Sequence, residues 1–438
     1  MARNSIIRCP IHGSISTSQR EFNLIDSPFF QRLRHISQLG FSSYVFPGAV
    51  HTRFSHSIGT MHLAGRVYDQ LLKGRFHHLQ DHYTGDQLEY FRMILRFSAL
   101  LHDLGHPPFS HAAEKLLPPL SALKRPDFLK EKKSRQSTHE DFSHAIIASM
   151  AGKLDVLSHE EAYDIIAILS KEIKPSSRMN SKSGDPKIFP LLCQLINGEI
   201  DVDRMDYLLR DSYFAGVPYG KFDIERLIGS LSCCLEESSG QFLLAIDGEG
   251  VPSYEIFLLA RVHMFSQIYF HKSLGAYIYY LKQAIAKSEI PFHIDGSLQK
   301  YLYLTESRAI EEIRKARHKK WSGKIHERIP AKNLIRVVNR EKEKSEQIEE
   351  IRRILKKEGI QIINSYSSNQ YSSQIKGSAV GHDTILVIEE EFGRKSIVPV
   401  AQRSALLDQK KKLIEIDQLY VLREDYEHAV SIIQGTST

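Results

Sequence analysis

Cysteine is scarce in this sequence, and the chain contains neither a long apolar run nor an apolar leader. The four cysteines, Cys9, Cys193, Cys233 and Cys234, have neither the spacing of a metal-ligand set nor that of a disulfide framework. Such a chain suits a reducing compartment. No segment reaches the roughly 18 apolar residues that a membrane span needs, and the N-terminus holds no apolar stretch long enough for a signal peptide. These absences predict a cytoplasmic protein without a membrane partner.

The composition is that of a globular protein with a mild basic excess. Apolar residues make up 42% of the 438 residues, which excludes a disordered chain, and this length predicts two lobes. The formal net charge of +6 fits an anionic partner, but a solvated basic face explains it equally well. A nucleic-acid partner is therefore compatible with the charge and not required by it. The 21 histidines favour metal or proton chemistry.

Hydrophobic periodicity predicts a mainly α protein in two parts. We expect helices over 28–39 (capped by Ser27, with Pro28 first), 56–72, 87–103, 191–213 and 254–288, and a short hairpin near 241–246. After residue 290 the pattern mixes charged helices at 306–318, 341–357 and 424–433 with strands at 360–364, 384–390, 396–400 and 416–422. The sequence therefore predicts a helical core, residues 1–290, and a smaller C-terminal α+β lobe, residues 291–438.

Three histidines and an aspartate are concentrated in one short segment. His102 and Asp103 are adjacent on an expected helix, about 100° apart around its axis, so both can turn toward one cation. His106 follows one turn later on the same face, and two prolines end the helix before His111. An isolated His-Asp pair is more often a histidine hydrogen-bonded in the core. Four such residues within ten positions favour a metal site.

Three other segments supply the polar groups that this motif lacks. His56 stands at the start of an expected helix, three residues after Arg53, and His139 opens another helix. A stripe at four-residue spacing lies on one face of the helix expected over 191–213; its members are Asp203, Tyr207 and Asp211. A stripe of this kind that faces inward is harder to explain by solvation or salt bridges than an ordinary charged run.

The ordered set His56, His102-Asp103 and Asp203 resembles the H…HD…D signature of HD-domain metal phosphohydrolases. Longer segments resemble the SAM-and-HD-domain deoxynucleoside triphosphate triphosphohydrolases and their bacterial relatives; they are residues 30–34, 38–40, 44–48, 53–56, 101–106, 109–111, 138–140 and 201–207. The resemblance covers about residues 6–290, does not include the separate SAM domain, and is looser in the C-terminal lobe. It implies an all-α HD-domain core.

The resemblance also implies a metal and a reaction. His56, His102, Asp103 and Asp203 would bind a divalent ion, and two histidines with two carboxylates suit Mn²⁺, Mg²⁺, Fe or Ni²⁺ better than a closed tetrahedral zinc site. The family hydrolyses dNTPs at the α-phosphorus and releases a deoxynucleoside and intact triphosphate.

Catalytic roles follow from the same resemblance. Arg53 would hold the α-phosphate, His111 would protonate the departing 5′-oxygen, and His139 would help to hold phosphate or water. Glu114 stands where the family has the aspartate that supports this acid. His106, on the metal-facing side of the motif, belongs to the expected catalytic set.

The resemblance further implies a set of substrate-binding residues, which are Gln38, Leu39, Arg204, Tyr207, Asp211, Arg261 and Tyr269. Gln38 and Asp211 would hydrogen-bond the sugar 3′-hydroxyl, and Tyr207 would pack on the sugar. Arg204 matches a family lysine at the phosphates. Arg261 and Tyr269, eight positions apart on one expected helix face, resemble a phosphate clamp and a gate against ribose.

Some relatives are tetramers assembled by regulatory nucleotides. The resemblance therefore implies a homo-oligomer, a dimer or a tetramer, with a dNTP or GTP as activator and a C-terminal lobe that takes part in regulation. The matching positions are Asp26, Gln31, Arg34, Val45, Phe46, His271, Lys272, Lys332 and Arg336. Where those relatives have Asn-Asp before Pro-Ile-His-Gly, this chain has Arg8 and Cys9.

We therefore expect a metal-dependent dNTP triphosphohydrolase that acts in dNTP pool control or in defence against phage. Two alternatives remain open. The same chemistry could act on another nucleotide or on single-stranded DNA ends, although a clamp on a free 3′-hydroxyl argues against a nuclease. The chain could also be a nucleotide sensor that binds without turnover, although the complete ligand set argues against this.

Overall fold

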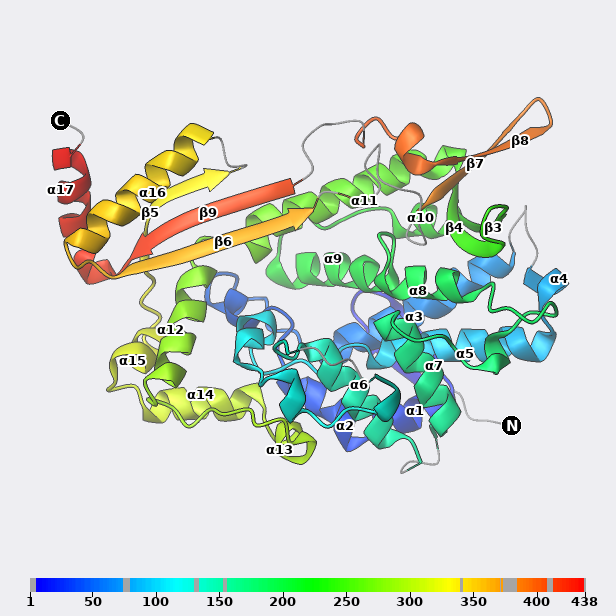
Figure 1. Ribbon diagram of the computed structural model, residues 1–438, viewed down its shortest axis with the longest axis horizontal. Helices are drawn as coiled ribbons and strands as arrows, with labels where there is room; N and C mark the ends of the chain where they lie inside the picture. The colour runs from blue at the N-terminus through cyan, green and yellow to red at the C-terminus, as the bar shows by residue number, and fades with distance from the viewer. Residues whose placement is uncertain are drawn as a thin grey trace.

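The computed structural model describes residues 5–73, 79–129, 134–152, 156–338, 342–370, 372, 384–407 and 413–436. A helical body makes up most of the molecule, and a long, narrow sheet extends from one end of it beside α16 and α17 (Figure 1). The prediction of a mainly α protein with a smaller α+β part near the C-terminus is confirmed.

The helices before residue 290 are α1 (Gln19–Ile25), α2 (Pro28–Gln31), α3 (Arg53–Leu72), α4 (Leu79–His82), α5 (Gly85–Leu101), α6 (His139–Met150), α7 (His159–Ser170), α8 (Phe189–Asn197), α9 (Val202–Ala215), α10 (Ile224–Gly229), α11 (Val251–Met264) and α12 (Leu274–Ala286). Those after it are α13 (Leu298–Leu302), α14 (Glu306–Lys315), α15 (Lys320–His326), α16 (Lys342–Lys357) and α17 (Tyr426–Thr436). Capping boxes fix where α5 and α6 begin: Thr84 and Thr138 accept hydrogen bonds from backbone amides three residues on, and Gln87 and Asp141 return them.

The strands form three sheets. β1 (Ser5–Cys9) and β2 (Gly13–Thr17) make an N-terminal hairpin, and β5 (Lys332–Val338), β9 (Leu413–Val421) and β6 (Ile362–Gln370) make an antiparallel sheet in that order. The third sheet has the order β3 (Leu231–Glu236), β4 (Gln241–Asp247), β7 (Leu386–Glu391), β8 (Arg394–Pro399), with β4 and β7 parallel. This sheet joins strands from both sides of residue 290, and the domain boundary expected there stays a prediction.

The structure differs from the expected elements in five places. The helix expected over 191–213 is broken between α8 and α9, and the helix expected over 254–288 is broken between α11 and α12. The helix expected over 28–39 stops at Gln31 and continues only as a 3-10 turn, Arg32–His35, because the chain then extends to pair Ser37 with Thr52. Helix α5 ends at Leu101, so the His-Asp motif lies on the turn that follows it. Strand β5 was not expected, because its basic and polar residues hide the alternation.

One large apolar core runs through the helical body and includes residues from α3, α5, α9 and α12. Helix α3 packs against both α5 and α9, which brings residues far apart in the sequence to one place. A smaller cluster lies between α16, α17 and the sheet β5-β9-β6; its members are Ile351, Leu355, Ile360, Leu419, Val421 and Ala429. Among the described residues, the helices are all too short or too polar to cross a bilayer.

Candidate active site

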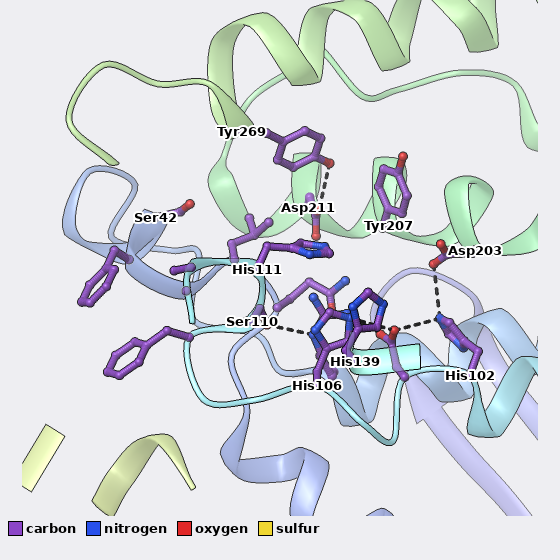
Figure 2. A pocket seen from close by; sticks show the side chains of 18 of the residues that line it. Ser42, His102, His106, Ser110, His111, His139, Asp203, Tyr207, Asp211 and Tyr269 are labelled. Atoms are coloured by element: carbon purple, nitrogen blue, oxygen red, sulfur yellow. Dashed lines mark hydrogen bonds and ion pairs between the residues drawn. The ribbon is translucent and has the colours of Figure 1, made fainter. Parts of the chain in front are cut away.

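A cavity of about 490 Å³ opens where α3, α6 and α9 meet the turn after α5. Figure 2 shows histidines from this turn and from α6 on one side, and Asp203, Tyr207 and Asp211 of α9 on the other. The expected site residues that line it are Gln38, Leu39, Arg53, His102, Asp103, His106, His111, His139, Asp203, Tyr207, Asp211 and Tyr269. Residues from six separate segments of the sequence thus line one cavity.

The four expected metal ligands converge at one end of this cavity, where His102, Asp103 and Asp203 line the wall and His56 is buried behind them. His56 Nε2 lies 2.9 Å from Asp203 Oδ1 and 3.7 Å from Asp103 Oδ2, and His102 Nε2 lies 3.5 Å from Asp203 Oδ1 and 3.3 Å from Asp103 Oδ1. Ligands about 2.1 Å from one ion are separated by about 3.0–3.4 Å. Both Nε2 atoms are buried, and among the described residues they face the carboxylates of Asp103 and Asp203 without a well-directed hydrogen bond. The residues therefore fit a shared divalent cation.

The opposite nitrogen of each histidine is fixed by the protein. His102 Nδ1 lies 2.8 Å from the Ala99 carbonyl, which can only accept, so Nδ1 carries the proton and Nε2 is free to bind an ion. His56 Nδ1 lies 2.7 Å from Asp206 Oδ2. Burial opposes charge on His56, but Asp203 and Asp206 raise the pKa of His56 to about 10. The site is thus built to hold positive charge.

Asp206 is a site residue that the sequence analysis missed. Its carboxylate is fully buried and also accepts two 2.8 Å hydrogen bonds from Arg210 and lies 2.6 Å from His12 Nε2. Burial would raise the pKa of Asp206, but Arg210 holds it well below its usual value. The place of Asp206, three residues after Asp203 on the same helix, was the only local signal available.

Arg53 joins the metal ligands to the wall of the cavity. It donates to Asp103 Oδ2 at 2.5 Å and to Ser110 Oγ at 2.8 Å. Burial would raise the pKa of Asp103, but the Arg53 charge, followed by those of His102 and His106, keeps it well below its usual value. Asp103 is therefore ionised and available as an anionic ligand.

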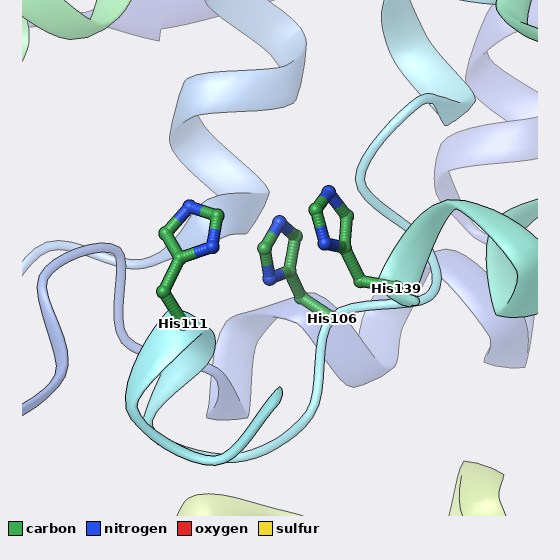
Figure 3. A group of neighbouring side chains, drawn as sticks. All are labelled: His106, His111 and His139. Atoms are coloured by element: carbon green, nitrogen blue, oxygen red, sulfur yellow. The ribbon is translucent and has the colours of Figure 1, made fainter. Parts of the chain in front are cut away.

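Three histidines form a second group beside this site (Figure 3). His106, His111 and His139 each offer a ring nitrogen within 4.8 Å of the others. The rings of His106 and His139 are stacked 3.8 Å apart at 20° to each other. An ion lies in the plane of each imidazole that binds it, so two stacked rings cannot share one without turning. This group suits an anion and proton transfer better than a second metal.

Glu114 connects the two outer histidines. Its Oε1 lies 2.5 Å from His139 Nδ1 and its Oε2 lies 3.2 Å from His111 Nδ1. Burial would raise the pKa of Glu114, but the hydrogen bonds to His111 and His139 lower it strongly. As an ionised acceptor, Glu114 fixes both rings with Nδ1 protonated and Nε2 turned elsewhere, toward the cavity that both rings line. Burial, and then Arg53 and His139, lower the pKa of His106, so this ring is neutral.

The other end of the cavity carries the residues expected to meet the sugar. Tyr269 donates to Asp211 Oδ2 at 2.7 Å, and the two are joined in Figure 2. His51, which the sequence analysis did not assign, lies 2.7 Å from Asp211 Oδ1 and fixes this carboxylate. Gln38 Oε1 is buried without a hydrogen-bond partner among the described residues. A polar ligand in the cavity could satisfy it.

Two expected phosphate-binding residues are placed differently. Arg204 forms an ion pair with Asp201 and a hydrogen bond to the Gly198 carbonyl, and neither Arg204 nor Arg261 is among the described residues that line the cavity. The helix that carries Arg261 changes from α to π at Phe265–Tyr269. The common face expected for Arg261 and Tyr269 stays a prediction.

The expected regulatory residues fall into two groups. In the first group, Gln31 donates to the Ile25 carbonyl and accepts from Arg34. The Arg34 guanidinium lies 3.5 Å over the Phe54 ring, and Asp26 is the C-cap residue of α1. In the second group, the Phe46 ring meets His271 at 5.6 Å, and burial, followed by the charges of Lys272 and Arg336, lowers the pKa of His271. Val45 packs against the core, and Lys332 lies 5.7 Å over the Tyr426 ring. Positive charge thus accumulates around His271.

Comparison with known proteins agrees with this arrangement. An uncharacterized protein of Methanocaldococcus jannaschii is 32% identical over 317 residues, which cover 70% of this chain and 57% of that protein. The deoxynucleoside triphosphate triphosphohydrolase SAMHD1 of Gallus gallus is 32% identical over 319 residues, which cover 69% of this chain and 48% of that protein. The crystal structure of a hypothetical protein from Aquifex aeolicus matches with a TM-score of 0.74 and 26% identity, over 98% of this chain and 100% of that chain. The chain spans about half the length of the curated relatives it matches.

The family model of the HD domain matches residues 53–211. The match begins at Arg53 and ends at Asp211, so it contains the four expected metal ligands and the three histidines beside them. The relatives include dNTP triphosphohydrolases at about 30% identity. Residues 53–211 therefore form an HD domain, which places the chain among the HD-domain proteins.

Proposed function

We propose that this protein hydrolyses dNTPs to a deoxynucleoside and inorganic triphosphate. One observation carries the proposal: a cation site, a group of histidines and a polar sugar-sized end share one cavity. The relationship to SAMHD1 proteins, whose name states this activity, supports it. A dNTP is a cytosolic metabolite, so the proposed substrate also favours the cytoplasm as the compartment.

His56, His102, Asp103 and Asp203 would hold the divalent ion. Their mixed nitrogen and oxygen donors favour Mn²⁺, Mg²⁺, Fe or Ni²⁺. When bound, such an ion supplies Lewis-acid chemistry, because it lowers the pKa of a coordinated water and neutralises charge on phosphate oxygens.

The protein's own residues would hold the phosphate and move a proton. Arg53 lies against the ligands, where its charge can hold the α-phosphate. His139, whose Nδ1 faces Glu114, would help to hold phosphate or water through its other ring nitrogen, with His106 beside it. A water oxygen attacks the α-phosphorus and loses a proton to solvent, and the bond from phosphorus to the 5′-oxygen breaks. The imidazolium form of His111 would give its proton to that oxygen. Glu114 stabilises the imidazolium before the transfer, since it already accepts from His111 Nδ1.

The sugar would lie between Gln38 and Asp211. The unpartnered Gln38 carbonyl or the Asp211 carboxylate would accept the one proton of a 3′-hydroxyl, while Tyr207 would pack on the ring beside Leu39. Tyr269 donates to Asp211, and beside a sugar held there it would take the space that a 2′-hydroxyl needs. Arg204 and Arg261 would reach the outer phosphates only after leaving the contacts described above.

A nucleotide activator and a homo-oligomer belong to the same proposal. Phe46, His271, Lys272 and Arg336 gather positive charge and aromatic surface of the kind that binds a nucleotide. Asp26, Gln31, Arg34, Val45 and Lys332 complete the proposed regulatory set. Control of the dNTP pool and defence against phage are both compatible with this activity.

Product analysis tests the proposal directly. Purified protein with Mn²⁺ is given each dNTP alone and all four together, and products are separated by chromatography. Deoxynucleoside and triphosphate are expected, and His102→Ala, which removes a ligand, should give neither product and retain no metal. Release of monophosphate and pyrophosphate would refute the proposal. Trimming of single-stranded DNA ends without dNTP hydrolysis would support a nuclease, and binding without turnover would support a sensor.

A further inference from the structure

Two segments that line the cavity, one before α3 and one after α5, are joined tightly to each other. Ser110 Oγ donates to the Ser37 carbonyl at 2.6 Å, and the rings of Phe41 and Phe109 stack at 4.6 Å. A Cβ on Gly40 would lie only 2.8 Å from the Phe109 carbonyl oxygen, so glycine is required for this approach. The first segment carries Gln38 and the second leads into His111. Their junction therefore sets how far apart these two residues lie.

The second segment is held in an unfavourable conformation. Phe109 has φ 63° and Ser110 has φ 52°, and two consecutive non-glycine residues in the left-handed region are uncommon. Such a conformation persists only where surrounding contacts impose it. With this backbone conformation, Ser110 Oγ accepts a hydrogen bond from Arg53 and donates one to the Ser37 carbonyl.

One carboxylate oxygen of Glu306, a residue outside the HD-domain match, binds both segments and stabilises the turn at Phe109 and Ser110. Oε2 of Glu306, the first residue of α14, accepts from Ser37 Oγ at 2.6 Å, from the Phe109 amide at 2.9 Å and from the Ser37 amide at 3.2 Å. A second contact comes from α13, where Tyr301 donates to the Gly105 carbonyl at 2.6 Å. The helices after residue 290 thus hold the active-site turn at two points.

We propose that Glu306 is a positioning residue that fixes the distance between the 3′-hydroxyl site at Gln38 and the proton donor His111. The inference rests on the proposed function for the identity of the substrate. Without the Glu306 oxygen, two amides lose their acceptor and the Phe109–Ser110 turn can relax to negative φ. Gln38 and His111 then no longer meet the two ends of one sugar, while the metal ligands keep their own supports.

The test compares three variants. Glu306→Ala removes the acceptor; Glu306→Gln keeps an oxygen of the same reach and loses only the charge; Glu311→Ala, an exposed position on the same helix paired with Arg314, is the matched control. Hydrogen exchange is measured at the amides of Ser37 and Phe109 in the metal-loaded protein, together with metal content. The specificity constants for a dNTP and for the matching 2′,3′-dideoxynucleotide are then compared.

Glu306→Ala should speed exchange at both amides, keep its metal, and lower the preference for dNTP over the dideoxynucleotide at least tenfold. Glu306→Gln should keep most of that preference, and Glu311→Ala should match the wild type in every measurement. An unchanged preference in a folded, metal-loaded Glu306→Ala would overturn the inference, as would unchanged exchange. If Glu306→Ala does not fold, Glu306→Asp replaces it, since its oxygen falls about 1.5 Å short and should give the same result. A wild type that hydrolyses no dNTP would refute the proposed function, and the exchange measurement would still decide the role of Glu306.

Discussion

Replacing Asp206 by asparagine should weaken metal binding although Asp206 is not a ligand. Asp206 holds His56 Nδ1 at 2.7 Å and so keeps the opposite nitrogen, Nε2, aimed at the cation site. Removing a partner of this kind lowers metal affinity about 10- to 100-fold, which corresponds to about 1.4–2.7 kcal/mol. The carboxylate also neutralises Arg210, whose side chain is fully buried. Leaving that cation unpaired should destabilise the fold by about 3–5 kcal/mol.

The two effects are separable because the chain offers a matched control. Asp164 is also a fully buried carboxylate and accepts from Tyr90 and Ser176, but it has no contact with the ligands. Asp164→Asn should lose stability in urea denaturation and bind Mn²⁺ like the wild type, whereas folded Asp206→Asn should bind it at least tenfold more weakly in a chelator competition. Equal Mn²⁺ affinities in the two variants would refute the reasoning.

Three further predictions concern the sugar, the regulatory charge and a buried histidine. Tyr269→Ala should raise the ratio of GTP to dGTP hydrolysis by about tenfold to 150-fold, because burying the ribose 2′-hydroxyl without a hydrogen-bond partner costs about 1–3 kcal/mol in the wild type. Tyr269→Phe, which keeps the ring, should stay near the wild-type ratio. An unchanged ratio in the alanine variant would exclude Tyr269 as the gate. Arg336→Ala should weaken a nucleotide-induced rise in mass measured by light scattering while metal content stays the same; a mass that never responds to any dNTP or GTP would contradict a regulatory role. His144 is buried, and burial lowers its pKa to about 4, so only the unfolded chain takes up this proton as the pH falls from about 6.5 to 4. Between pH 7 and pH 5 the wild type should therefore lose about 2 kcal/mol more unfolding free energy than His144→Gln. Equal losses in the two proteins, measured by urea denaturation at both pH values, would contradict this prediction.

Local patterns in the sequence predicted the parts of the fold and site that depend on local structure. Ser27 and Pro28 begin a helix as expected, and the four-residue spacing of the stripe on α9 places Asp203, Tyr207 and Asp211 in one cavity. These inferences hold because each depends on neighbours within one or two turns. Their catalytic and binding roles remain proposals.

Contacts between distant segments could not be read in the same way. His12 reaches Asp206 across 194 positions and His51 reaches Asp211 across 160, and a partner at such a separation leaves no periodic trace near either residue. Glu306 looks like an ordinary charged residue at the start of a charged helix. The early end of the helix after Pro28 has a related cause, since pairing with Thr52 outweighs the local propensity of residues 36–39.

The parallel pairing of β4 with β7 has a consequence for how the chain is made. Strand β4 ends at Asp247 and its partner β7 begins at Leu386. A ribosome that adds roughly 5–20 residues per second therefore needs about 7–28 s to synthesise the segment between the two strands. During that interval the β3–β4 hairpin presents an open edge and an apolar face of Cys234, Leu243 and Ala245, against which Leu386 and Ile388 later pack. An uncovered strand edge is a template for pairing with another chain. The newly made protein therefore passes through an aggregation-prone stage, and its yield should depend on chaperones that shield this hairpin until the last quarter of the chain emerges.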